Sequence, residues 1–94
     1  MPTLHIEHPT PSFDTWKRAF DSDPAGRRQS GVRRYRVSRA VDDPNYVMID
    51  LEFDTREEAE ALLRVMRAVW GQSDHSVSRN QQTRIVDVVE TREL

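Results

Sequence analysis

His5 and Glu7 are well suited to proton transfer, and they lie two positions apart in the sequence. Apolar and polar residues alternate in this segment, so in a β-strand both side chains point to the same face. Asp50 and Glu52 lie in a second alternating segment, and either can join them across a sheet. Such a cluster can pass a proton or ligate a metal ion. We therefore predict His5, Glu7 and Asp50 as candidate catalytic residues, with His5 as the proton-transfer group and Glu7 or Asp50 orienting it.

A purely structural role is the competing interpretation of this cluster. Charged pairs on neighbouring strands commonly stabilise sheets, so the three side chains can simply form a hydrogen-bonded cluster at a subunit interface. His8 does not form a metal pair with His5, because residues three positions apart on a strand point to opposite faces. We predict neither a metal site nor a bound cofactor.

Four further residues are candidates for binding a small organic ligand, namely Trp16, Arg36, Tyr46 and Met48. Trp16 and Tyr46 offer flat walls, and Arg36 can stabilise an enolate or a carboxylate. For Trp16 a core position is the more frequent role, because it falls at helical spacing with Phe13 and Phe20.

Six predicted segments position these residues, in the order strand, helix, strand, strand, helix, strand. Alternating or β-branched residues predict strands over residues 2–8, 31–41, 46–53 and 83–90, with a turn at 42–45 and a loop at 72–82. Ser12 is placed to cap the first helix, which residues 23–26 end. Thr55 and Glu58 fit a capping box for the second helix, and Gly71 is its predicted C-cap.

This order is that of the ferredoxin-like βαββαβ arrangement, an α+β fold. Right-handed crossovers place both helices on one face of a four-stranded antiparallel sheet. That face is predicted to bury the apolar set Leu4, Ile6, Val47, Ile49, Leu51 and Phe53. The opposite face then carries the candidate catalytic residues. At 94 residues, the whole range 1–94 suits a single domain.

The last predicted strand indicates a second subunit. It lies at the edge of the sheet in this topology, yet residues 85–89 (Ile-Val-Asp-Val-Val) are apolar on both sides. A bare apolar edge strand invites aggregation, and a second copy of the chain would cover it. We therefore predict a homodimer.

Composition argues against several classes of partner. The formal net charge is −2, which gives no general attraction to nucleic acid or to an anionic membrane. The arginine-rich stretch 27–39 could bind an anionic ligand, or RNA on the sheet, but among the central-strand residues of that face only Tyr46 is an aromatic that could stack a base. A solvated edge strand paired with Asp50 and Glu52 is the favoured interpretation. The chain has no cysteine and no apolar run long enough to cross a bilayer. We predict a cytoplasmic protein that binds neither nucleic acid nor membrane.

Three segments carry a resemblance to a known family. They are residues 12–16 (Ser-Phe-Asp-Thr-Trp), residues 43–47 (Asp-Pro-Asn-Tyr-Val) and residues 53–59 (Phe-Asp-Thr-Arg-Glu-Glu-Ala). Together they resemble the dimeric α/β-barrel superfamily, which includes antibiotic-biosynthesis monooxygenases, haem-degrading monooxygenases and small polyketide cyclases. The resemblance spans nearly the whole chain. It implies two sheets packed face to face, with ligands inside the barrel or between sheet and helices.

The resemblance implies that the protein is a cofactor-independent monooxygenase or cyclase that acts on an aromatic or polyketide-like compound. The haem-degrading members use an asparagine on the first strand with a tryptophan and a histidine near the second helix. Here Trp70 and His75 are close in sequence, but the first strand offers His5 and Glu7 instead of asparagine. Haem oxygenation is therefore not predicted. The alternative is a non-enzymatic stress, regulatory or assembly module whose sheet face is only an interface.

Overall fold

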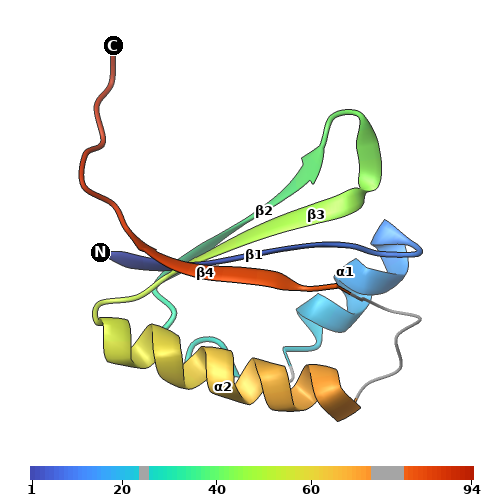
Figure 1. The fold of residues 1–94 in the computed structure, drawn as a ribbon, viewed down its shortest axis with the longest axis horizontal. Coiled ribbons are helices and arrows are strands. Elements are labelled where there is room, and N and C mark those ends of the chain that lie inside the picture. Colours follow the sequence, from blue (N-terminus) through green and yellow to red (C-terminus); the bar gives the residue numbers. More distant parts are fainter. Residues whose placement is uncertain (24–25, 73–79) are drawn as a thin grey trace.

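The chain folds into a four-stranded antiparallel sheet with two helices on one of its faces (Figure 1). The computed structural model describes residues 1–23, 26–72 and 80–94. In chain order the elements are β1 (Pro2–Pro9), α1 (Phe13–Asp21), β2 (Arg34–Ala40), β3 (Asp43–Glu52), α2 (Arg56–Gln72) and β4 (Gln82–Asp87). The strand order is β2-β3-β1-β4, so β1 and β3 are central and β4 is an edge strand. The predicted ferredoxin-like α+β fold is confirmed.

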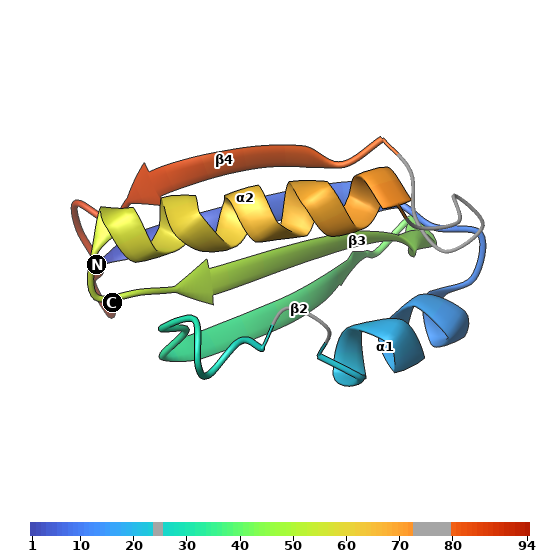
Figure 2. The same cartoon turned by 90° about the horizontal axis from the view of Figure 1, so that it is seen from below.

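Both helices lie on the same side of the sheet. Figure 2 shows α2 running along the sheet between β4 and β3, with α1 on the β2 side of it. On the other side of the sheet, the C-terminal tail and the β2–β3 hairpin both project away from the helices (Figure 1). The face without helices, which we call the open face, therefore lies between these two projections.

The alternation along the central strands decides which residues enter the core. Leu4 pairs with Leu51, and Ile6 pairs with Ile49. All four side chains are at most 2% exposed. The remaining predicted core residues, Val47 and Phe53, are fully buried as well. The predicted core face is confirmed for all six residues. From α2 the core receives Ala59, Leu62 and Leu63, with Met66 and Trp70 packed beside them.

The predicted N-terminal caps of both helices are present. The Ser12 hydroxyl accepts a hydrogen bond from the backbone N–H of Thr15 at 3.4 Å. At the start of α2, the Glu58 N–H donates to Thr55 Oγ1 and the Thr55 N–H donates to Glu58 Oε1, each at 3.2 Å. These bonds satisfy backbone donors that the first helical turn leaves unpaired.

Two strand boundaries differ from the prediction. β2 begins at Arg34, because residues 27–31 form turns. Gly26 before these turns and Gly31 at their end take positive φ angles of 64° and 98°. β3 begins at Asp43, which pairs with Ala40, so the turn is confined to residues 41–42. Proline 44 is tolerated because the pairing of β3 with β1 starts only at Tyr46.

Two predicted ends were also misplaced. β4 ends at Asp87, and Val88 and Val89 belong to the tail. Gly71 does not cap α2, because the helix continues to Gln72. A glycine weakens a helix by about 1 kcal/mol, which does not by itself stop one. The first helix ends at Asp21 with Ser22 as its C-cap, just before the predicted end at residues 23–26. Residues 24–25 of that segment, and His75 in the predicted loop, lie outside the described residues. No helix in the described part of the chain is long and apolar enough to cross a membrane.

Candidate functional site

The open face collects the predicted catalytic residues through the register of β1 and β3. His5 on β1 lies directly opposite Asp50 on β3, and Glu7 lies opposite Met48. Tyr46 lies one pair further along the same face, opposite Pro9. Side chains on directly opposed positions of antiparallel strands are close enough to interact. The sheet therefore brings together residues that are about forty positions apart in sequence.

Four of these side chains form a continuous hydrogen-bonded chain, which we call the His5 network. His5 Nδ1 lies 2.7 Å from Asp50 Oδ1, and His5 Nε2 lies 3.0 Å from Glu7 Oε1. The Tyr46 hydroxyl donates to the other carboxylate oxygen of Glu7 at 2.6 Å. The chain thus runs Tyr46–Glu7–His5–Asp50 across the two central strands.

Carboxylates on both sides of the ring favour the charged form of His5. The hydrogen bond to Asp50 is the main cause that raises the His5 pKa, and the bond to Glu7 adds to it while burial opposes it. The pKa of Glu7 is lowered by the hydrogen bonds from Tyr46 and His5, and the pKa of Tyr46 is raised by its bond to Glu7. The network can therefore hold an imidazolium between two carboxylates.

The same geometry is poorly arranged for metal binding. The two nitrogens of the His5 ring point to different carboxylates, so the donor atoms flank the ring instead of converging on one point. Among residues 1–23, 26–72 and 80–94, no group of three or more His, Asp or Glu side chains is arranged to hold a metal ion. Proton transfer and charge stabilisation are the chemistry that this arrangement supports.

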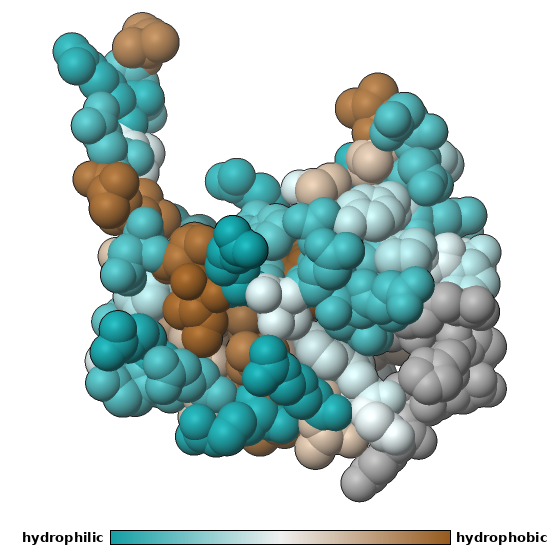
Figure 3. Space-filling view, viewed as in Figure 1, coloured by the Kyte–Doolittle hydropathy of each residue, from teal (hydrophilic) through white to brown (hydrophobic). Residues whose placement is uncertain are grey.

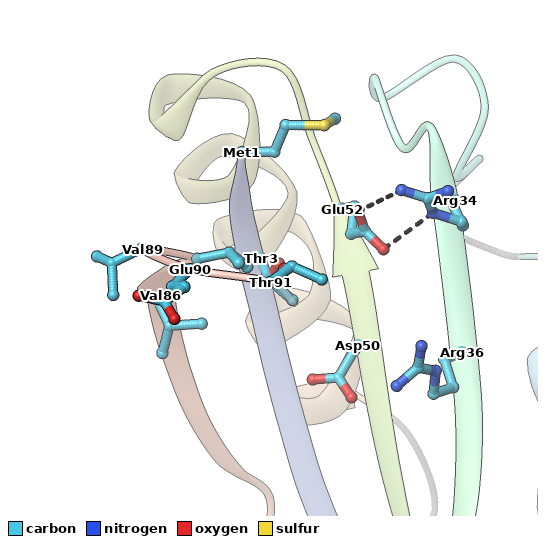
Figure 4. Close-up of a pocket in the computed structure, with 11 residues that line it drawn as sticks. Met1, Thr3, Arg34, Arg36, Asp50, Glu52, Val86, Val89, Glu90 and Thr91 are labelled. Carbon is cyan, nitrogen blue, oxygen red and sulfur yellow. Dashed lines mark hydrogen bonds and ion pairs between the residues drawn. The ribbon is translucent and has the colours of Figure 1, made fainter. Parts of the chain in front are cut away.

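One end of the network reaches a broad hollow of about 860 Å³ on the open face (Figure 4). The floor is formed by Thr3 of β1 and by Asp50 and Glu52 of β3, and one wall is formed by Arg34 and Arg36 of β2. The opposite wall comes from Met1, Val86 and the tail residues Val88, Val89, Glu90 and Thr91. Asp50 is the member of the His5 network that lines this hollow.

The two arginines of the hollow differ in their partners. Arg34 makes two hydrogen bonds to the carboxylate of Glu52, at 3.0 Å and 2.9 Å. This pairing raises the pKa of Arg34 and lowers that of Glu52. Arg36 lies opposite Asp50 in the register, and in Figure 4 its guanidinium points toward that carboxylate without a contact drawn between them.

The structure therefore brings most of the predicted site residues to the open face. Hydrogen bonds link Tyr46, Glu7, His5 and Asp50 in that order. Met48 and Arg36 lie on the same face. These placements make the predicted roles geometrically possible. The roles themselves stay predictions.

Trp16 is the exception: it does not lie beside His5 as a wall, and the core position that its helical spacing favoured is confirmed. It lies under the opposite face of the sheet, 6% exposed, and stacks on Phe20 with 5.1 Å between ring centroids. The rings of Trp16 and His8 also meet edge to face, with 5.8 Å between their centroids. The three-residue spacing predicted that His8 faces away from His5, and His8 is indeed buried on the core side. Burial lowers the pKa of His8, so this histidine favours the neutral form.

The prediction of a ligand site from the sequence did not include the apolar wall of the hollow. Val86 and Val88 were noted in the sequence only as residues of an apolar edge strand. Apolar surface gathers along β4 and at the foot of the tail (Figure 3). There Met1 is 53% exposed, Val88 49% and Val89 94%. The apolar stretch at residues 85–89 was the available signal, but the sequence did not show that the tail leaves the sheet there.

Comparison with known structures identifies the fold. SnoaB from Streptomyces nogalater, described as a cofactor-independent oxygenase, matches with a TM-score of 0.73 and 14% identity over 96% of this chain and 94% of that one. A dimeric ferredoxin-like protein from an uncultured marine organism matches with a TM-score of 0.67 and 10% identity over 99% and 98% of the two chains. The chain has the ferredoxin-like fold of these proteins.

The predicted resemblance is thereby confirmed at the level of the fold. A structure described as an antibiotic biosynthesis monooxygenase matches this ferredoxin-like chain with a TM-score of 0.63 and 11% identity, over 96% of this chain and all of that one. No protein-family model matches the sequence, and no curated protein matches it significantly.

Proposed function

We propose that this ferredoxin-like protein is a homodimer that binds a small organic molecule over the open face of its sheet. Two observations support the second copy. The apolar wall beside β4 is exposed in the single chain, and exposed apolar patches of this kind commonly mark interfaces. Structures with the same fold include proteins described as dimeric ferredoxin-like. A second sheet packed against the open face would roof the hollow and exclude water from the His5 network.

The activity that we propose is a cofactor-independent oxygenation or cyclisation of an aromatic or polyketide-like compound. The observation that supports it is the His5 network, whose Asp50 end lines the hollow. Asp50, rather than the predicted His5, would accept a proton from an acidic C–H or O–H of the ligand, because both ring nitrogens of His5 bond to carboxylates and only Asp50 lines the hollow. The imidazolium of His5 would hold the Asp50 carboxylate in place and balance charge, while Glu7 and Tyr46 fix the other side of the ring.

Anthrone is a suitable probe for the oxygenation, because loss of a ring C–H proton gives a carbanion that dioxygen can attack. The CH₂ carbon becomes a carbonyl, one oxygen atom enters the quinone and the other leaves as water. Quinone absorbance and oxygen uptake report the turnover. We expect turnover by the wild type and a loss of roughly 100-fold or more in the Asp50→Asn variant, which lacks the proposed base. Turnover should also fall in the His5→Ala variant, which lacks the group that positions Asp50.

Controls separate this proposal from loss of the fold. Lys17→Gln changes an exposed side chain of α1, on the other side of the sheet from the network, and should turn over anthrone as the wild type does. Unchanged turnover and ligand binding in the His5→Ala variant would exclude His5 from the proposed mechanism. A particle of 11 kDa at working concentration, measured by sedimentation, would exclude the homodimer.

The second candidate is a dimeric module without enzymatic activity, in which the open face is only an interface. One observation favours it: His5, Glu7 and Tyr46 bond to each other and do not line the hollow. A dimer structure whose interface side chains fill the hollow completely would support the module over the enzyme. A cytoplasmic location is proposed for either function, because a chain without cysteine needs no oxidising compartment.

A further inference from the structure

Resting on the proposed ligand site over the open face, we infer that the ligand is an amphipathic organic anion. Its carboxylate would bind the guanidinium of Arg36, and its apolar body would lie against Val86, Val88 and Met1. Three features of the hollow carry this inference, namely its unpaired cation, the separation of its polar and apolar walls, and its size.

Among the side chains that line the hollow, pairing leaves one cation available. Arg34 donates two hydrogen bonds to Glu52, and His5 is hydrogen-bonded to Asp50 at 2.7 Å. No hydrogen bond or ion pair joins Arg36 to any residue in the described ranges of the chain. A guanidinium presents a planar set of donors that matches a carboxylate with two parallel bonds. Arg36 is therefore the cationic side chain of this hollow that an anion can bind without displacing a hydrogen-bonded partner. The other cation at the hollow, the α-amino group of Met1, belongs to the main chain, and its charge acts on Glu52.

The walls of the hollow fix the orientation of such a ligand. The cationic side belongs to β2, and the apolar side belongs to β4 and the tail (Figure 4). Val86 is 37% exposed and Val88 49%, so both have surface left to bury. Glu90 also lies on the tail side and would repel an anionic head there. The charged head is thus directed to Arg36 and the apolar body to the valines.

The size of the hollow suits an organic ligand of this kind. A volume of about 860 Å³ falls within the roughly 300–1,000 Å³ that is usual for small-molecule sites. A simple inorganic anion would occupy little of this space and would leave the apolar wall uncovered. The favoured class is therefore a carboxylate attached to a rigid apolar group such as a bicyclic aromatic ring.

The test compares 2-naphthoate with its neutral isostere 2-naphthamide on the full-length protein. Binding is followed by two-dimensional amide NMR of the ¹⁵N-labelled chain, which locates the site and gives the affinity. We expect naphthoate to shift the amide resonances of Arg36 and Val88 and to bind roughly tenfold more tightly than naphthamide, as one charge-assisted pair implies. The Arg36→Gln variant should bind both compounds equally.

Arg39→Gln is the matched control. It removes the same charge from the same strand, but Arg39 lies on the other face of the sheet, 4.3 Å above the ring of Phe13. This variant should keep the preference for naphthoate. Equal binding of the two compounds by the wild type would overturn the inference, as would shifts confined to the helix side around Trp16. Equal losses in Arg36→Gln and Arg39→Gln would also overturn it, because bulk charge would then explain the preference.

Failure of this inference can be told apart from failure of the proposed function. A wild-type dimer that turns over anthrone but does not prefer naphthoate refutes only the ligand class. A monomeric wild type, or turnover independent of His5, refutes the proposed function whatever naphthoate does.

Discussion

The hydrogen bond between His5 and Asp50 is the most informative single interaction to measure. We consider His5→Gln, Asp50→Asn and the double variant, which together form a double-mutant cycle. The two side chains are 29% and 35% exposed, and their atoms are 2.7 Å apart. A hydrogen bond to a charged group contributes about 1.5–3 kcal/mol, whereas an exposed ion pair contributes about 0–1 kcal/mol. Because this pair is partly exposed, we expect a coupling energy of about 1 kcal/mol near pH 6.

The coupling should depend on pH in one direction. The pKa of His5 is raised in the folded protein, chiefly by the bond to Asp50. The stabilisation from protonated His5 is therefore complete below the unfolded-state pKa of about 6.5. It is lost as the pH rises through the folded-state pKa. A neutral imidazole can still donate one hydrogen bond, so the coupling near pH 9 should be smaller but not zero.

Urea unfolding of the four proteins measures this coupling. One protein concentration is used throughout, because a dimer gains stability with concentration. A coupling of about 1 kcal/mol corresponds to roughly 4–8 °C in Tm for a domain of this size. The exposed Lys17–Asp21 pair is the control cycle, with an expected coupling of about 0.3–0.5 kcal/mol that stays the same at both pH values. A His5–Asp50 coupling that is absent near pH 6, or that grows toward pH 9, would refute the reasoning.

Three further predictions concern stability and are measured by chemical or thermal unfolding. Leu51→Ala should lower the free energy of unfolding by about 2–5 kcal/mol, because Leu51 is fully buried. Val65 is exposed, so Val65→Ala should change it by less than about 0.5 kcal/mol. Similar effects of the two substitutions would contradict the assigned core. Thr55→Ala should cost about 1 kcal/mol through loss of the α2 capping box, and no change would show that the cap is dispensable. Gly31→Ala should lower the free energy of unfolding by more than about 1 kcal/mol, since the φ of Gly31 is 98° and an added Cβ would meet the Glu58 carboxylate. A neutral effect would argue against this turn.

The faces of the central strands could be predicted because they follow from local geometry. Successive side chains of a strand point to opposite faces, so Leu4 and Ile6 in the core require His5 and Glu7 on the open face. The helix caps were predictable for the same reason, since each involves residues within one turn. No contact between distant parts of the chain was needed for these predictions.

The prediction of Trp16 as a ligand wall is wrong, whereas the core position that its spacing with Phe13 and Phe20 favoured is confirmed. Helical spacing shows that one stripe of a helix is buried, but not which face of the sheet the helix covers. The right-handed crossover places α1 on the side of Leu4, so Trp16 packs into the core. The fold prediction already contained this consequence for Trp16, since it placed both helices on the face opposite the catalytic candidates.

The sequence by itself determined which residues share a face, where the helices begin, and that the edge strand is apolar. These features depend on the period of the backbone and on neighbours a few residues away. The tertiary structure alone decided that Tyr46 reaches Glu7, that Arg34 pairs with Glu52 while Arg36 is left to face the hollow, and that the tail supplies an apolar wall. These features depend on strand register, and a shift of one residue would exchange the two faces of a strand.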